Sequence, residues 1–229
     1  MLSIFSVMIK HLNRKVVRMN HKNNIFYKAH KRVKEAISAR KKVLLWKLKG
    51  RPVPAPHAVK QAIVREYEAK FKLPVFVETG TYMGEMIDAV LNLFPKIISI
   101  EFDPKLAQRA KDKYSSMRHV AILQGDSGAL MPELLSGIKE PCLFWLDAHY
   151  SGGVTGQADS ETPIVKEIKS ILAHPRSDHV ILIDDAREFT GNSNYPTLEE
   201  LKQILKNSRR EWQMTVDADV IRIHKQSLD

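Results

Sequence analysis

The sequence predicts an α/β fold, a doubly wound and mostly parallel seven-stranded sheet with an antiparallel C-terminal strand, preceded by a basic helical N-terminal extension. After Pro74, short apolar runs of strand length alternate with helical stretches, which is the pattern of parallel βαβ units. The last two apolar runs are separated by only two residues, too few for a helical crossover. They therefore predict a hairpin and one reversed strand.

The elements of the main domain follow from this alternation. Strands are expected at residues 75–78, 97–101, 119–124, 142–147, 179–184, 211–216 and 219–224. Helices are expected at residues 57–72, 84–93, 104–114, 128–136, 162–173 and 197–206. In such sheets ligands bind beyond the carboxyl ends of the strands, so the loops after the first five strands form the candidate functional site.

The basic charge lies in the N-terminal part. Residues 1–60 contain 16 Lys and Arg but one acid, Glu35, whereas residues 61–229 contain 20 bases and 25 acids. Nucleic acid is therefore not an expected partner of the main domain, because phosphate binding needs clustered bases on the folded surface. Residues 1–50 are open to three interpretations: a peripheral membrane contact, an organelle transit segment or a solvated basic arm.

The extension is expected to comprise residues 1–56, and the main domain residues 57–229. The run KRVKEAISARKKVLLWKLK, residues 31–49, has apolar residues at helical spacing and predicts a basic amphipathic helix. Three prolines between Pro52 and Pro56 then force an extended linker.

Two further features bear on the compartment. No stretch approaches the roughly 20 apolar residues that span a bilayer, and MLSIFSVMIKHL lacks the cleavage site of a secretory signal. One cysteine, Cys142, excludes an intramolecular disulfide and a multi-cysteine zinc site, and its apolar surroundings indicate a small buried side chain. We expect a cytoplasmic protein, or a membrane-peripheral one if residues 1–50 bind lipid.

The first three strands end in residues suited to a nucleoside. The loop ETGTYMG, residues 78–84, is a glycine-bearing turn that either admits a ligand close to the backbone or is simply tight. Glu101 can accept hydrogen bonds from both hydroxyls of a ribose. Asp126 can accept from an adenine amino group and Ser127 can add a cap or a backbone contact, whereas Asp103 before Pro104 is interpreted as a helix start.

This arrangement resembles the AdoMet-dependent methyltransferases of the Rossmann-like, seven-stranded kind, from about Leu73 to His224 and including the terminal hairpin. The resemblance implies that the chain binds S-adenosyl-L-methionine. The implied cofactor contacts are Glu78, Gly80, Thr81 and Gly84 at the methionine part, Glu101 at the ribose, and Asp126 and Ser127 at the adenine. The family's turn is often richer in glycine, and here Thr79, Thr81 and Met83 occupy some of those places.

The ends of the fourth and fifth strands carry Asp147, Asp184 and Asp185. In this fold the two strands are neighbours about 4.8 Å apart, so the three carboxylates are expected to converge. Carboxylates this close repel one another unless a cation joins them. Oxygen ligands of this kind suit Mg²⁺, Mn²⁺ or Ca²⁺, and zinc is not expected.

The same acids resemble those of metal-dependent small-molecule O-methyltransferases of the catechol and macrocin types. The macrocin type has an LDxDxY pattern after strand four and an acidic pair after strand five, and this chain has LDAHY and IDDAREF. Asp147, Asp184 and Asp185 match the metal ligands. His149 stands at the second acid, where it is either the general base that deprotonates the substrate hydroxyl or a surface residue.

Other residues near these loops are open to two interpretations each. The loop HYSGGVTGQADSETP, residues 149–163, is a substrate lid or an ordinary solvent loop. Arg187 binds an acidic or phosphorylated substrate or forms a structural salt bridge. Tyr150 and Tyr195 are candidates to line the same pocket.

The sequence thus predicts AdoMet-dependent, divalent-metal-assisted O-methylation of a hydroxyl on a small molecule or sugar. One alternative is a non-catalytic protein of the same fold that docks to membrane or RNA through its basic N-terminus. Another is a metal-dependent hydrolase, which leaves Glu101 and Asp126 without a role.

Overall fold

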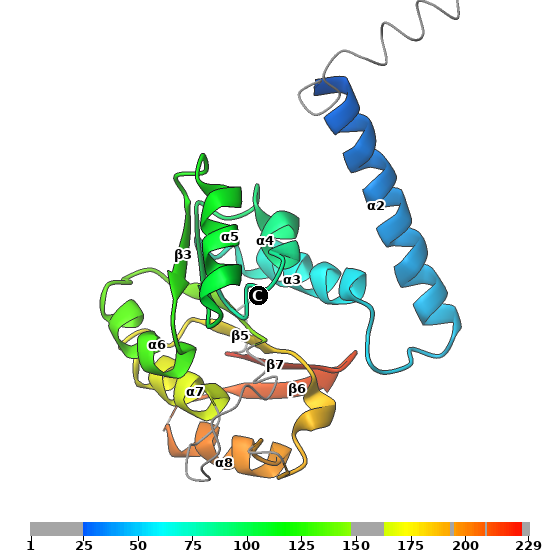
Figure 1. Ribbon diagram of the computed structural model, residues 1–229. Coiled ribbons are helices and arrows are strands. Elements are labelled where there is room, and N and C mark those ends of the chain that lie inside the picture. The colour runs from blue at the N-terminus through cyan, green and yellow to red at the C-terminus, as the bar shows by residue number, and fades with distance from the viewer. Residues whose placement is uncertain (1–24, 148–162, 193–194, 209, 226–229) are drawn as a thin grey trace, which may run out of the picture. The chain divides into compact units, whose positions relative to one another are not determined.

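The computed structural model describes residues 25–147, 163–192, 195–208 and 210–225 (Figure 1). The chain divides into two compact units, Met1–Gly50 and Arg51–Asp229. The first unit contains helix α2 (Ile25–Leu48), which begins six residues before the predicted helix because no helix breaker precedes it. Within the described residues, no helix has both the length and the hydropathy needed to cross a membrane.

The second unit is built on the predicted seven-stranded sheet, in the order β3-β2-β1-β4-β5-β7-β6. Its strands are β1 (Val75–Thr79), β2 (Lys96–Glu101), β3 (Val120–Gln124), β4 (Cys142–Leu146), β5 (Val180–Ile183), β6 (Gln213–Asp217) and β7 (Val220–His224). The first five are parallel, and β7 is antiparallel to both β5 and β6. Every residue of β1, β4 and β5 is buried, as expected of central parallel strands covered on both faces.

Helices cover both faces of this sheet, with α3, α4 and α5 on one side and α6, α7 and α8 on the other (Figure 1). Their bounds are α3 (His57–Phe71), α4 (Glu85–Val90), α5 (Pro104–Tyr114), α6 (Ser127–Ser136), α7 (Pro163–Ala173) and α8 (Leu198–Asn207), and a short 3₁₀ helix, η1 (Ala186–Glu188), follows β5. Asp103 caps α5, as predicted, by accepting from the backbone N–H groups of Lys105 and Leu106. This cap begins α5 soon after β2 ends, which keeps the loop between them short.

Two elements differ from the sequence prediction. Helix α4 ends at Val90 instead of residue 93, because Pro95 is incompatible with further helix and a turn closed by the Leu93 N–H to the Val90 carbonyl intervenes. The final hairpin turns at Ala218 and Asp219, one residue later than predicted. Both have positive φ angles, 53° and 62°, which is the backbone that two-residue hairpins require.

A chain of buried hydrogen bonds joins the amino ends of β4 and β5. The backbone N–H of Cys142 donates to Nδ1 of His179 at 3.0 Å, so the proton of this neutral imidazole is on Nε2. That nitrogen lies 2.9 Å from Nδ1 of His174, whose own Nε2 lies 3.0 Å from the carbonyl of Ile138. Each donor in this chain of hydrogen bonds has an acceptor only while both imidazole rings are neutral. Cys142 is buried, as predicted.

We predict that His179 makes stability depend on pH. Burial lowers the pKa of His179 to about 4, with His174 the next cause, so the unfolded chain binds this proton more readily between about pH 6.5 and 4. The free energy of unfolding should fall as the pH drops through this window. Urea denaturation of wild type and His179→Gln at pH 7 and 4.5 tests this, because Gln keeps an acceptor for Cys142 but does not titrate. An equal loss of stability in both proteins would contradict the prediction.

Candidate functional site

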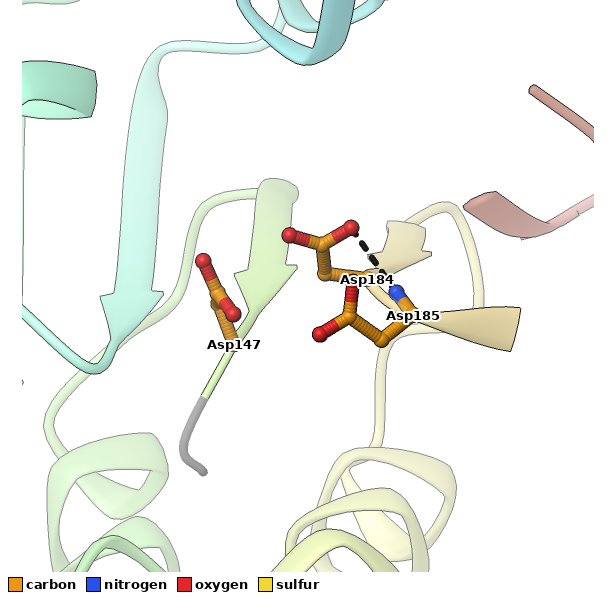
Figure 2. A group of neighbouring side chains, drawn as sticks. All are labelled: Asp147, Asp184 and Asp185. Atoms are coloured by element: carbon orange, nitrogen blue, oxygen red, sulfur yellow. Dashed lines mark hydrogen bonds between the residues drawn. The ribbon is translucent and has the colours of Figure 1, made fainter. Parts of the chain in front are cut away.

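The parallel strands bring the three predicted carboxylates together. The backbone N–H of Asp147 donates to Thr79 of β1, and that of Asp184 donates to Leu146 of β4, so the sheet ladder continues into the acidic residues. One carboxylate oxygen from each of Asp147, Asp184 and Asp185 lies within 4.8 Å of the others. Figure 2 shows Asp147 at the end of β4, facing the Asp184 and Asp185 pair across a short gap.

The Asp184–Asp185 turn is held in a sparsely populated backbone conformation. Asp185 has a φ of 52°, unusual for a residue other than glycine, and its N–H donates to Oδ1 of Asp184 at 2.8 Å. The hairpin turn supports it, since Asp219 accepts from Arg187 N–H through Oδ1 and from Ala186 N–H through its carbonyl. Strain held at this position by surrounding structure is typical of a functional site.

Lys60 of α3, which precedes the first strand, reaches this cluster. Its Nζ donates to Oδ2 of Asp184 at 2.5 Å and to Oδ1 of Asp185 at 3.1 Å, and its side chain is 13% exposed. Burial, together with the charges of Asp147 and Asp185, raises the pKa of Asp184 to about 7, although Lys60 opposes the shift. Lys60 therefore lowers the repulsion within the cluster without removing it.

Arg187 is the second cation, and it forms the ion pair expected under one of its two interpretations. Its Nη1 donates to Oδ1 of Asp185 at 2.7 Å and to Oδ2 of Asp219. Arg187 also pairs with Glu188, so five carboxylates, those of Asp147, Asp184, Asp185, Glu188 and Asp219, face two cations, a formal charge of −3 when all are ionised. This excess of negative charge and the converging oxygen donors fit a hard divalent metal ion.

The remaining substrate-side predictions fall partly outside the described residues. His149, Tyr150 and most of the predicted lid, residues 149–163, lie there. Tyr195 is half-buried, with its ring packed edge-on against Phe189 at 5.3 Å. Burial raises the pKa of Tyr195 to about 12, and Asp185 and Asp147 add to the shift, so this phenol stays neutral beside the acids.

The glycine turn after β1 has the geometry of a close backbone approach. Gly80 and Gly84 have positive φ angles of 87° and 73°. A Cβ on Gly84 would lie 2.4 Å from the hydroxyl oxygen of Tyr114, so no other residue fits without displacing that side chain. Tyr114 in turn donates to the carbonyl of Gly84 at 2.7 Å.

Glu78 and Thr81 meet in a buried polar network. Ser99 of β2 donates to Oε2 of Glu78 at 2.5 Å, and its oxygen lies 2.6 Å from Oγ1 of Thr81. Burial raises the pKa of Glu78 to about 8, although Ser99 favours the ionised form. This network joins β1, its glycine turn and β2, and a cofactor contact by Glu78 or Thr81 stays a prediction.

Glu101 ties two carboxyl-end loops together. Its carboxylate accepts from the backbone N–H of Tyr82 at 2.7 Å and from that of Asp103 at 3.0 Å. Each oxygen keeps a lone pair beyond these bonds, which is what a contact to two ribose hydroxyls requires.

After β3, Asp126 acts as a helix cap. Its Oδ1 accepts from Gly128 N–H at 2.8 Å and from Ala129 N–H at 3.4 Å, which fixes the start of α6. Ser127 is the first residue of that helix and is 6% exposed. One oxygen of Asp126 is thus committed to the helix, and only the other is suited to the predicted adenine contact.

Two buried polar side chains near these loops lack a hydrogen-bond partner in the part of the chain that the structure describes. They are Thr79, at the end of β1, and Glu167, on α7. Unsatisfied buried groups of this kind are rare and point to a bound water or ligand. The residues at the ends of β1, β2 and β3 therefore fit a polar cofactor such as AdoMet.

Comparison with solved structures identifies the fold. The O-methyltransferase TomG from Streptomyces achromogenes, in complex with SAM, matches with a TM-score of 0.54 and 14% identity over 82% of this chain and 89% of that one. An O-methyltransferase from Bacillus cereus, in complex with SAH, gives 0.54 and 12% over 82% and 90%. SAH-bound PaMTH1 from Podospora anserina gives 0.52 and 17% over 86% and 96%.

The chain has the fold of the Rossmann-like AdoMet-dependent methyltransferases. No protein-family model matches its sequence, and no curated protein matches it significantly. The predicted fold class is confirmed.

Sequence reasoning missed Lys60 and Glu167. Lys60 lies on the helix predicted at residues 57–72, to which the sequence analysis assigned no functional role, and one lysine among many carries no signal of its own. Glu167 interrupts the apolar stripe of α7 formed by Ile164, Ile168 and Ile171, which was a detectable signal.

We predict that Lys60→Met destabilises the protein more at pH 8 than at pH 5.5. At pH 8 it leaves ionised Asp184 and Asp185 without this cation, at a cost of about 2 kcal/mol. At pH 5.5 Asp184, with its pKa raised to about 7, is protonated and the loss should be smaller. Denaturation in EDTA at each pH measures the two losses of stability. The control is Lys70→Met, which changes an exposed lysine of the same helix. A loss equal to that of the control at both pH values would refute the structural role.

Proposed function

We propose that the protein is an AdoMet-dependent methyltransferase that methylates a hydroxyl of a small molecule or sugar with the help of a divalent cation. The observation that carries this proposal is that the carboxyl ends of the parallel strands hold both residues suited to an adenosyl cofactor and the carboxylate cluster. The glycine turn follows β1, and Glu101 is the last residue of β2. On the other side of β1, Asp147 follows β4, and Asp184 and Asp185 follow β5. Neighbours of the same fold bind SAM or SAH, which supports the cofactor.

In this function each group has one role. Gly80 lets the cofactor approach the backbone, Gly84 makes room for Tyr114 behind the turn, and Glu101 accepts from the ribose hydroxyls. Asp147, Asp184 and Asp185 hold a divalent cation, which when bound acidifies a substrate hydroxyl. His149 is the proposed base that takes the hydroxyl proton.

The energetic basis is alignment. Methyl transfer needs the hydroxyl oxygen, the methyl carbon and the sulfur in line, and fixing two bound reactants in that geometry removes much of the barrier. The hydrogen bond from the backbone N–H of Asp147 to Thr79 places the carboxylate cluster beside the carboxyl end of β1. A substrate held at the cluster would thus lie next to the cofactor's methyl group. Tyr195, which lies in the field of the same acids, is a candidate wall of that pocket.

The charge of the cluster favours this function over a non-catalytic docking protein of the same fold. A protein that only docks through its N-terminal segment has no use for three converging carboxylates at the ends of two strands. A metal-dependent hydrolase would use the cluster but not Glu101, whose position at the end of β2 suits a nucleoside.

Removal of the metal should abolish methyl transfer. We expect transfer from tritiated AdoMet to a panel of hydroxylated small molecules and sugars to fall about 100-fold or more in EDTA and in Asp147→Asn, because the cation contributes several kcal/mol at the reacting oxygen. Asp112→Asn, an exposed aspartate on α5, is the matched control. Undiminished transfer in both EDTA and Asp147→Asn would exclude the metal role.

Cofactor binding should depend on Glu101. We expect Glu101→Gln to weaken SAH binding about 10-fold, since a charge-assisted bond to the ribose becomes a neutral one. Calorimetry at constant pH measures this, with circular dichroism to confirm folding. Glu133→Gln on α6 is the control for loss of an acidic side chain. Equal affinity in wild type and Glu101→Gln would remove Glu101 from the cofactor site.

A further inference from the structure

Helix α2 exposes a stripe of aliphatic side chains. Ile37, Leu44 and Leu48 are 61%, 57% and 74% exposed, and they are called the aliphatic stripe below. Leu44 and Leu48 come seven and eleven residues after Ile37, and at 3.6 residues per turn these spacings place all three on one side of the helix. Large apolar side chains that are exposed together on one face are typical of a surface that binds a partner.

Basic side chains border the aliphatic stripe. Arg40 and Lys41 come three and four residues after Ile37, so they lie on its two sides in the next turn of the helix. Lys34 and Lys47 lie three residues from a member of the stripe, and all four basic residues are exposed. Because Lys and Arg have long apolar stems, their charged ends can reach past an apolar face to a charged layer above it.

The charge of the helix is almost entirely positive. Helix α2 contains eight Lys and Arg residues and one acid, Glu35, and residues 1–60 contain 16 bases and the same single acid. Residues 61–229, in contrast, contain 25 acids and 20 bases. A partner with a negatively charged surface is therefore attracted to the basic helix rather than to the main domain.

The aliphatic stripe favours a lipid bilayer over a nucleic acid as this partner. Phosphate contacts need only the bases, and surfaces that bind single-stranded nucleic acid stack the nucleotide bases on aromatic rings, not on Leu or Ile side chains. An anionic bilayer matches both features of α2, because its headgroups attract Lys and Arg and the boundary with its acyl chains accepts aliphatic side chains. Eight bases among 24 residues suit the surface of a bilayer and not its hydrocarbon core.

We propose that α2 binds the surface of an anionic lipid bilayer, with Ile37, Leu44 and Leu48 inserted at the headgroup boundary and Arg40 and Lys41 bound to anionic headgroups. This inference is independent of the proposed function, since it concerns where the protein binds and not which reaction it catalyses. Binding of this kind is reversible and weakens with added salt, because part of the attraction is electrostatic.

Flotation of the full-length protein with lipid vesicles tests the proposal. The vesicles contain either phosphatidylcholine alone or phosphatidylcholine with about 30% phosphatidylserine, which supplies the negative charge. We expect wild type to bind the anionic vesicles at least about tenfold more tightly than the neutral ones, and to lose most of this preference at about 0.5 M NaCl.

Two double substitutions separate the apolar contribution from the charged one. Leu44→Ser with Leu48→Ser should weaken binding to the anionic vesicles about tenfold, because two aliphatic side chains no longer leave water. Arg40→Gln with Lys41→Gln should weaken it about 30-fold, because each base near an anionic surface contributes roughly fivefold.

The controls change exposed residues of the main domain. Lys105→Gln with Lys111→Gln removes two positive charges from α5, and Leu93→Ser removes an exposed leucine. Both controls should bind the vesicles as wild type does, and circular dichroism should show that every variant is folded. If a double variant fails to fold, the single changes Ile37→Ser and Lys34→Gln replace it, with expected losses of about threefold and fivefold.

Three results would overturn the inference. The first is wild type that does not float with anionic vesicles at low salt. The second is a folded Leu44→Ser, Leu48→Ser protein that binds these vesicles as tightly as wild type, since the stripe would then not enter the bilayer. The third is wild type that binds a labelled single-stranded RNA more tightly than the anionic vesicles, with Arg40→Gln and Lys41→Gln weakening only the RNA complex, which would make nucleic acid the partner.

Discussion

Parallel strands force like charges together at the carboxyl edge of this sheet, and the site depends on how that repulsion is balanced. Asp147 ends β4, Asp184 and Asp185 end β5, and the backbone ladder fixes them next to β1. Lys60 and Arg187 offset part of the charge. Asp219, in the hairpin turn, binds Arg187 next to Asp185. The antiparallel strands thus also help to fix the loop that carries Asp185.

Much of this could be predicted from the sequence, because the end of each strand can be recognised from neighbouring residues and the fold then determines where that end lies. Alternation of strands and helices predicts the parallel sheet, and a parallel sheet places all carboxyl ends on one edge. The convergence of Asp147 with Asp184 and Asp185 follows from that rule together with the strand order of the fold, in which β4 and β5 are neighbours. Helix caps such as Asp103 were equally predictable, because they act within three residues of their own position.

What could not be predicted depends on contacts between distant segments. Lys60 reaches Asp184 across 124 residues of sequence, and only the packing of α3 on the sheet determines that contact. Glu167 occupies a helix position where an acid is usually solvated, and only the register of α7 against β1 and α6 buries it. The hairpin turn differed by one residue because Ala218, which rarely adopts a positive φ angle, does so here together with Asp219.

The central claim is that the carboxylate cluster and the glycine turn together bind a divalent cation and an adenosyl cofactor. A crystal structure with SAH and Mn²⁺, with data collected at the manganese absorption edge, tests it most directly. We expect an anomalous peak bound by Asp147 and by at least one of Asp184 and Asp185, with Lys60 displaced from Asp184 and SAH over Gly80. Absence of the peak, with Lys60 still bound to Asp184 beside an ordered SAH, would contradict the account.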